Sequence, residues 1–301
     1  MAQTLAVIDL GSNTFHLLIV SVSKGVIDQV LCRKRVFTGL SEGGVEIIHH
    51  DSMKFGWATL EEFNGLLGQY HHPKLRVIGT AALRKASNRQ EFIDRAQNIL
   101  NTPIEIIDGQ QEAHYIYKGI TLLGDMSRGH HLIMDIGGGS TEFIIISEGK
   151  KLWSNSYPLG VGVLHAKFHK HEPISTEEIK NLTDHVMTIV SDMVDKIGQY
   201  NFDSLAGASG SFEVLQSMSG LDISSDQTCE ISIDIFQKIY TSIVYADVRQ
   251  RKQLSGLPAE RVKLIVVGML LKSIIIELIK PRHITVSPYA LKEGVLSEMM
   301  D

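Results

Sequence analysis

The hydrophobic residues of this chain fall into two kinds of segment: short apolar runs that end at small-residue turns, and longer stretches with a helical repeat. Near the N-terminus, Leu5–Ile8 and Phe15–Val20 are apolar runs of strand length, separated by small residues around Gly11. Val26–Lys34 follows as a third strand. Ser52–Gln69 repeats its apolar residues every three or four positions, which predicts an amphipathic helix.

Strands and helices then alternate along the chain. The pattern predicts a strand at 75–80, a helix at 89–100, a strand at 104–107 and a helix at 110–123. A run of strands followed by this alternation is typical of an α/β domain with a mixed sheet. The same order returns after Asp135, with a mostly helical stretch at 176–200 and a strand and turn at 204–211. We therefore expect two similar domains, at 1–120 and 121–289, with a C-terminal helix at 290–301 that packs back onto the first.

Two of the predicted hairpins carry an aspartate where a buried strand gives way to a turn. Asp9 precedes Gly11-Ser12-Asn13, and Asp135 precedes Gly137-Gly138-Gly139-Ser140. Such small residues let backbone N–H groups approach an anion closely, so each hairpin is typical of a phosphate-binding turn. A carboxylate beside a phosphate would repel it unless a divalent cation lay between them. The pattern therefore predicts Mg²⁺ as well as phosphate.

Composition and charge narrow the class of protein. A formal net charge of −5 argues against a general nucleic-acid binder, which usually carries a basic surplus. Cys32 and Cys229 lie too far apart in sequence for a disulfide framework or a zinc ribbon. No basic and apolar leader precedes the first strand, and three charged residues interrupt the apolar stretch Val262–Ile279. We expect a cytoplasmic protein in which that stretch is a buried helix.

Other phosphate and metal signatures are weak or missing. The chain has no G-x-x-x-x-G-K-[ST] motif, and Gly137-Gly138-Gly139 lacks the G-x-G-x-x-G spacing of a dinucleotide site. His165, His169 and His171 allow a zinc site as one interpretation. Because no nearby cysteine or carboxylate completes a convincing ligand set, a solvated helix end is favoured.

Five motifs, in this order, together resemble one known family, that of the exopolyphosphatases and guanosine pentaphosphate phosphohydrolases (Ppx/GppA), in a short two-domain form. The motifs are Asp9-Leu-Gly-Ser-Asn-Thr14, Gly79-Thr-Ala-Ala-Leu-Arg84, Gly109-Gln-Gln-Glu112-Ala113, Asp135-Ile-Gly-Gly-Gly-Ser-Thr-Glu142 and Leu291-Lys-Glu-Gly294-Val295. The resemblance implies two ribonuclease-H-like domains of the actin-like ATPase superfamily, with mixed sheets, flanking helices and an active site in the cleft between the domains.

The resemblance also implies roles for individual residues. Glu112 would be the catalytic base that activates water, and Arg84 would clamp phosphate oxygens. Asp135 and Glu142 would bind Mg²⁺, with Asp9 in support. The expected phosphate-binding residues are Ser12, Asn13, Gly137, Gly138, Gly139, Ser140, Thr141, Ser209 and Gly210.

Each of these assignments has a simpler alternative. Glu112 would by default be an exposed residue on a helix, Arg84 a solvated loop residue, and Glu142 an outward-facing residue that alternates with Phe143. The chain also departs from the family pattern at Gln111, His114 and Lys292. We expect these departures to affect substrate preference more than hydrolysis.

The sequence thus predicts a Mg²⁺-dependent hydrolase that removes terminal phosphate from inorganic polyphosphate, with guanosine pentaphosphate as an alternative or additional substrate. Two alternatives stay open: an ATP-dependent small-molecule kinase of the same superfamily, in which 207–210 would form part of an adenosine pocket, and an actin-like nucleotide-binding assembly protein. No nucleic-acid or membrane partner is expected, and the sequence leaves a homodimer open.

Overall fold

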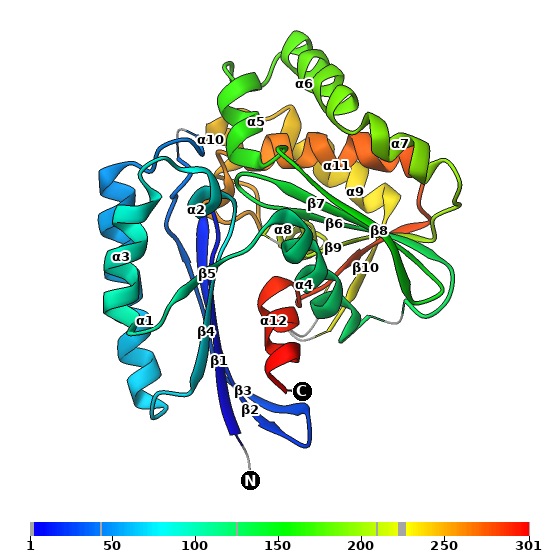
Figure 1. The fold of residues 1–301 in the computed structure, drawn as a ribbon. Helices are drawn as coiled ribbons and strands as arrows, with labels where there is room; N and C mark the ends of the chain where they lie inside the picture. The colour runs from blue at the N-terminus through cyan, green and yellow to red at the C-terminus, as the bar shows by residue number, and fades with distance from the viewer. Residues whose placement is uncertain (1–2, 43, 125, 209, 222–226, 301) are drawn as a thin grey trace. The chain divides into compact units, whose positions relative to one another are not determined.

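The chain divides into two compact units, each with one β-sheet and flanking helices (Figure 1). In the computed structural model the described residues are 3–300 without 43, 125, 209 and 222–226. Unit 1 comprises Met1–Gly119 and Ala290–Asp301, and unit 2 comprises Ile120–Tyr289. The C-terminal helix thus belongs to the same unit as the N-terminal strands.

The sheet of unit 1 has the strand order β3-β2-β1-β4-β5. Its strands are β1 (Gln3–Leu10), β2 (Thr14–Ser23), β3 (Val26–Phe37), β4 (Lys74–Gly79) and β5 (Ile104–Ile106). The first three strands pair antiparallel, whereas β1, β4 and β5 run parallel. Antiparallel hairpins need only short turns and parallel pairs need crossovers, which explains why helices appear only after β3.

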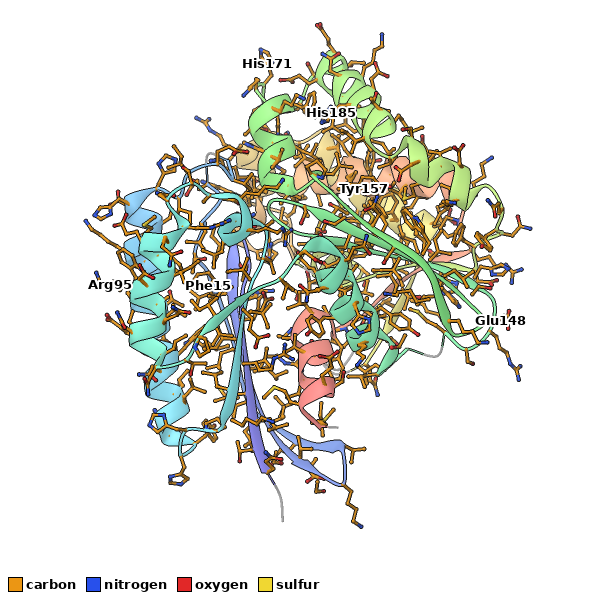
Figure 2. All side chains as sticks on the ribbon, viewed as in Figure 1. Phe15, Arg95, Glu148, Tyr157, His171 and His185 are labelled. Atoms are coloured by element: carbon orange, nitrogen blue, oxygen red, sulfur yellow. The ribbon has the colours of Figure 1, made fainter. Side chains whose placement is uncertain are left out.

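The helices of the unit are α1 (His50–Gln69), α2 (Ala81–Lys85), α3 (Arg89–Leu100), α4 (Gly109–Thr121) and α12 (Leu291–Met300). One face of this sheet packs against α1 and α3 to form an apolar cluster. Ile8, Leu10 and Leu17 belong to a buried apolar cluster with side chains of α1 and α3. Phe15, which is labelled in Figure 2, belongs to the same cluster. Its ring lies 6.1 Å from that of Phe92.

Two glycines let α4 and α12 touch through their backbones. A Cβ atom at Gly119 would lie 1.8 Å from the carbonyl oxygen of Ala290, and one at Gly294 would lie 1.8 Å from that of Tyr115. Any larger residue would separate the helices. This contact gives a physical reason for the glycine in the motif Leu291–Val295, and α12 in turn packs against β1 and β2.

The sheet of unit 2 repeats this topology. Its order is β10-β11-β9-β6-β7-β8, in which β8-β7-β6-β9-β11 corresponds to the five strands of unit 1 and β10 extends the edge. The strands are β6 (His130–Ile136), β7 (Thr141–Ser147), β8 (Lys150–Tyr157), β9 (Ser204–Gly207), β10 (Cys229–Ser232) and β11 (His283–Val286). β6, β7 and β8 pair antiparallel, and β6, β9 and β11 pair parallel. Both halves therefore have the mixed, ribonuclease-H-like sheet that the sequence predicts.

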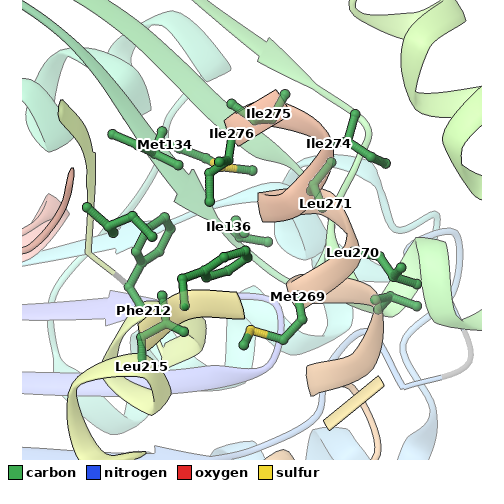
Figure 3. Packing of buried hydrophobic residues seen from close by; sticks show 14 of the residues in the cluster. Met134, Ile136, Phe212, Leu215, Met269, Leu270, Leu271, Ile274, Ile275 and Ile276 are labelled. Carbon is green, nitrogen blue, oxygen red and sulfur yellow. The ribbon is translucent and has the colours of Figure 1, made fainter. Parts of the chain in front are cut away.

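Helices supply most of the remaining core of unit 2. They are α5 (Val161–Phe168), α6 (Thr176–Ile189), α7 (Ser191–Ile197), α8 (Gly210–Met218), α9 (Ile233–Val244), α10 (Val248–Arg251), a 3-10 turn η1 (Ala259–Arg261) and α11 (Ile265–Ile279). The apolar side chains of α11 pack with Met134, Ile136 and Phe212 (Figure 3). The apolar stretch near 262–279 is thus a core helix, and among the described residues no helix is both long and apolar enough to cross a membrane.

Candidate active site

The turn that follows Asp9 is held by a set of hydrogen bonds. The Gly11 amide donates to the Thr14 carbonyl across the turn (3.1 Å). Ser12 Oγ accepts a hydrogen bond from the Ala82 amide of α2 (3.1 Å), and Asn13 Oδ1 accepts one from Ser41 Oγ (2.8 Å). Ser12 and Asn13 are buried. These two predicted phosphate-binding residues therefore anchor the turn to the rest of unit 1.

Asp9 lies at the end of β1 with an unsatisfied oxygen. Among the described residues, its buried Oδ1 has no hydrogen-bond partner, although the residue as a whole keeps partial exposure. Burial raises the pKa of Asp9 to about 7; Lys292 opposes this rise, and Glu112 and Glu293 add to it. A buried carboxylate oxygen without a donor is costly, so Asp9 is suited to binding a cation or a hydrogen-bond donor.

Glu112 and Arg84 form a pair in unit 1. Glu112 lies in the first turn of α4, is 7% exposed, and accepts a hydrogen bond at Oε2 from Arg84 Nη1 (3.1 Å). Arg84 Nη1 also donates to the Ile107 carbonyl (2.7 Å), which fixes the guanidinium beside the start of α4. The interpretation of Glu112 as an exposed helix residue is therefore wrong, because α4 turns this side chain inward. The interpretation of Arg84 as a solvated loop residue is also wrong, because Arg84 lies in α2 and its partly buried side chain is paired with Glu112.

The N-terminus of α12 contributes two charges near Asp9. Glu293 is fully buried, and its Oε2 accepts a hydrogen bond from the Ala290 amide (2.8 Å). Its Oε1 lies 3.2 Å from Lys292 Nζ, close enough for an ion pair but without hydrogen-bond geometry. Both residues act electrostatically on Asp9. The sequence interpretation assigned no role to Glu293, although its place in the motif Leu291–Val295 was the available signal.

In unit 2, Asp135 and Glu142 lie directly opposite each other. They are cross-strand partners in the antiparallel pair β6 and β7. Glu142 is 1% exposed, and its Oε1 accepts a hydrogen bond from Ser156 Oγ (2.7 Å). The outward-facing interpretation of Glu142 is therefore wrong. Two carboxylates directly opposite each other repel, and this oxygen-only donor set is suited to Mg²⁺.

The glycine turn between these strands packs against the start of α5. The Gly137 amide donates to the Ser140 carbonyl (2.9 Å), and the Gly137 and Gly138 carbonyls accept hydrogen bonds from Val161 and Gly162. A Cβ atom at Gly160 would lie 2.4 Å from the Gly139 nitrogen.

Two side chains after this turn are also buried. Ser140 is 4% exposed, and Thr141 Oγ1 donates to the Leu159 carbonyl (2.9 Å). Thr141 thus uses its hydroxyl proton within the protein.

The remaining predicted phosphate-binding residues lie near the start of α8. Ser209 is outside the described residues. Gly210 begins α8, and a Cβ atom there would lie 1.9 Å from Arg261 Nη2. The glycine thus makes room for the guanidinium of Arg261.

His165 and His169 lie close together near α5. The rings of His165 and His169 are 5.0 Å apart, but the described part of the chain contains no group of three or more histidine, cysteine or carboxylate side chains that could hold a metal ion. His169 is buried, and its Nε2 lies 3.4 Å from Glu172 Oε1. Burial lowers the pKa of both histidines, that of His165 to about 4. The solvated-end interpretation is therefore wrong for His169.

Comparison with known proteins gives relatives of this chain in sequence. It is 30% identical to a guanosine-5'-triphosphate,3'-diphosphate pyrophosphatase of Vibrio parahaemolyticus, over 98% of this chain and 59% of that protein. A protein of the same name from Vibrio campbellii is 31% identical over the same shares. The chain thus spans 59% of the length of these curated relatives.

Solved structures give relatives in fold. A crystal structure of an exopolyphosphatase from Cytophaga hutchinsonii matches with a TM-score of 0.94 and 32% identity, over 99% of this chain and 98% of that one. The Aquifex aeolicus PPX-GPPA enzyme matches in fold with a TM-score of 0.81 at 23% identity, over 99% and 100% of the two chains. The model of the Ppx/GppA phosphatase family matches residues 18–301. The chain belongs to the Ppx/GppA phosphatase family.

Proposed function

We propose that this protein hydrolyses the terminal phosphoanhydride bond of inorganic polyphosphate, of guanosine pentaphosphate, or of both. The observation that carries the proposal is the pair of buried Glu112 and partly buried Arg84 in a chain of this family. A buried carboxylate held by a guanidinium has a fixed position and orientation, as a general base requires. This pair favours hydrolysis over the kinase and assembly-protein alternatives.

In the proposed reaction, Glu112 accepts a proton from the attacking water. The water oxygen forms a bond to the terminal phosphorus, and the bond from that phosphorus to the bridging oxygen breaks. Inorganic phosphate leaves, and the shortened chain keeps the bridging oxygen. Arg84 orients Glu112 and supplies further N–H donors for phosphate oxygens, since a guanidinium has five.

The carboxylates of Asp135 and Glu142 in unit 2 would hold Mg²⁺. Bound there, the ion would neutralise charge on non-bridging phosphate oxygens. Ser156 keeps Glu142 oriented through its hydrogen bond to Oε1. The Gly137 amide is used within the turn, so the backbone amides of Gly138, Gly139 and Ser140 would meet phosphate oxygens, because the glycines place no side chain in the way.

The substrate proposal rests on the names of the relatives. One group is named for guanosine pentaphosphate and one structure for polyphosphate, and both substrates end in the same phosphoanhydride. The test is phosphate release from polyphosphate, guanosine pentaphosphate and ATP, side by side, with Mg²⁺ and with excess EDTA. We expect Mg²⁺-dependent release from at least one of the first two. Release from ATP alone, or release unaffected by EDTA, would overturn the proposal.

A further inference from the structure

The two hairpins have the same register but different residues opposite their aspartates. In unit 2, Asp135 on β6 lies opposite Glu142 on β7. In unit 1, Asp9 on β1 lies opposite His16 on β2. Each aspartate is the second-last residue of its strand, and the turn between partners has the same length. His16 therefore occupies in unit 1 the position that Glu142 occupies in unit 2.

The Asp9 side of the sheet is the face away from the main core of unit 1. Leu10, Phe15 and Leu17 pack in the cluster with α1 and α3. Because side chains alternate along a strand, Asp9 and His16 lie on the opposite face, where α12 packs against β1 and β2. Half-buried His16 in turn lies opposite the exposed Arg35 of β3.

Three neighbouring strands thus carry a row of Asp9, His16 and Arg35 on one face. Cross-strand partners of this kind have Cβ atoms about 4.5–5.5 Å apart. Lys292 of α12 acts electrostatically on Asp9 from the same side. The row contains one carboxylate and two nitrogen donors, whereas the equivalent position in unit 2 has two carboxylates.

This difference has a chemical consequence. Mg²⁺ prefers carboxylate and other oxygen ligands, so the pair in unit 2 is the one suited to the metal. A guanidinium and an imidazole N–H donate to phosphate oxygens, and a guanidinium can do so with two parallel hydrogen bonds.

We propose that His16 and Arg35 form an anion subsite that binds phosphoryl groups of the substrate chain beyond the one removed. The inference rests on the proposed function and names binding residues for its substrate. It assigns the two hairpins different tasks, anion binding in unit 1 and metal binding in unit 2.

The test is the affinity for tripolyphosphate, measured by isothermal titration calorimetry in EDTA at fixed ionic strength. The variants are Arg35→Gln and His16→Gln, with Lys34→Gln as the matched control. Lys34 is the neighbour of Arg35 and loses the same charge, but it lies on the other face of β3, 2.7 Å from Glu62 of α1. Thermal unfolding of each variant checks that it is folded.

We expect Arg35→Gln to raise the dissociation constant about tenfold and His16→Gln about fivefold, with less than a twofold change for Lys34→Gln, because a phosphate contact at short range outweighs a distant charge. Arg35→Lys keeps the charge without the planar fork and should fall between wild type and Arg35→Gln. Equal effects of Arg35→Gln and Lys34→Gln, or no effect of either, would overturn the subsite. If the variants give that result while the wild type still releases phosphate, the subsite is overturned and the proposed function is left intact. If the wild type neither binds tripolyphosphate nor releases phosphate, both proposals are overturned.

Discussion

At the scale of single residues, unit 1 concentrates carboxylates where burial makes them costly. Asp9, Glu112 and Glu293 are brought together from β1, α4 and α12, and Arg84 and Lys292 supply the opposing charge. Removing one partner of a buried charge pair leaves the other uncompensated, which is usually worse than losing both. Substitutions here should therefore be close in shape, so that a change in function is not masked by unfolding.

Glu112→Gln is the isosteric test of the base. The amide oxygen can still accept the hydrogen bond from Arg84 Nη1, so we expect tripolyphosphate affinity within about threefold of wild type, while turnover falls by about 10²- to 10⁴-fold. The measurement is phosphate release under saturating substrate, with Glu91→Gln as the control, since Glu91 is an exposed residue of α3. Turnover within a few-fold of wild type would exclude Glu112 as the base.

The raised pKa of Asp9 predicts a pH dependence of stability. Burial raises the folded-state pKa to about 7, above the unfolded value near 3.9, so the ionised form is disfavoured in the folded state. The stability that Asp9 contributes in its neutral form is fully present below about pH 4 and is lost as the pH rises through about 7. In metal-free buffer, Asp9→Asn should match wild type near pH 4 and unfold a few degrees higher at pH 8. Parallel melting curves across this range would contradict the assignment.

At the scale of elements, the contact between α4 and α12 places charged residues from two distant segments near Asp9. α4 carries Glu112 and α12 carries Lys292, and Gly119 and Gly294 let the two backbones meet. The periodicity of each helix is visible in the sequence, but this contact is not, because helical patterns do not specify which helices touch. The glycines and the buried Glu293 therefore acquire a physical reason only in the folded unit.

Gly294→Ala tests this contact. The added methyl group would lie 1.8 Å from the Tyr115 carbonyl oxygen, so the helices must separate, and we expect a loss of about 1–3 kcal/mol in unfolding free energy together with lower activity. Gly65→Ala in α1 is the control, because a Cβ atom there meets nothing within 4 Å and alanine favours a helix by up to about 1 kcal/mol. Equal stability of the two variants would show that α4 and α12 need no close approach.

At the scale of the whole molecule, the repeated topology could be predicted from sequence because its signals are local. Apolar strands, small-residue turns and helical periods mark most elements within a few residues, and the two Asp-containing hairpins mark the repeat. Strand alternation alone does not predict the buried position of Glu142, because β7 pairs with both β6 and β8 and is buried along nearly its whole length. His169 is similar, because Glu172 next to it is bound by the buried Arg251 of α10, far along the chain.

The repeat also predicts an asymmetry between its two aspartates. Asp135 faces a second carboxylate, whereas Asp9 faces His16, so the metal should depend mainly on unit 2. We expect Asp135→Asn to raise the Mg²⁺ concentration for half-maximal phosphate release at least tenfold, because a neutral amide oxygen is a poorer ligand for a hard cation. Asp9→Asn should lower the maximal rate while shifting that concentration by less than about threefold.

Direct Mn²⁺ titration of the same variants checks, without turnover, which aspartate matters more for metal binding, since Asp135→Asn should lose Mn²⁺ affinity and Asp9→Asn should largely keep it. Equal shifts for the two variants would show that both hairpins hold the metal, and the different residues opposite their aspartates would then need another explanation.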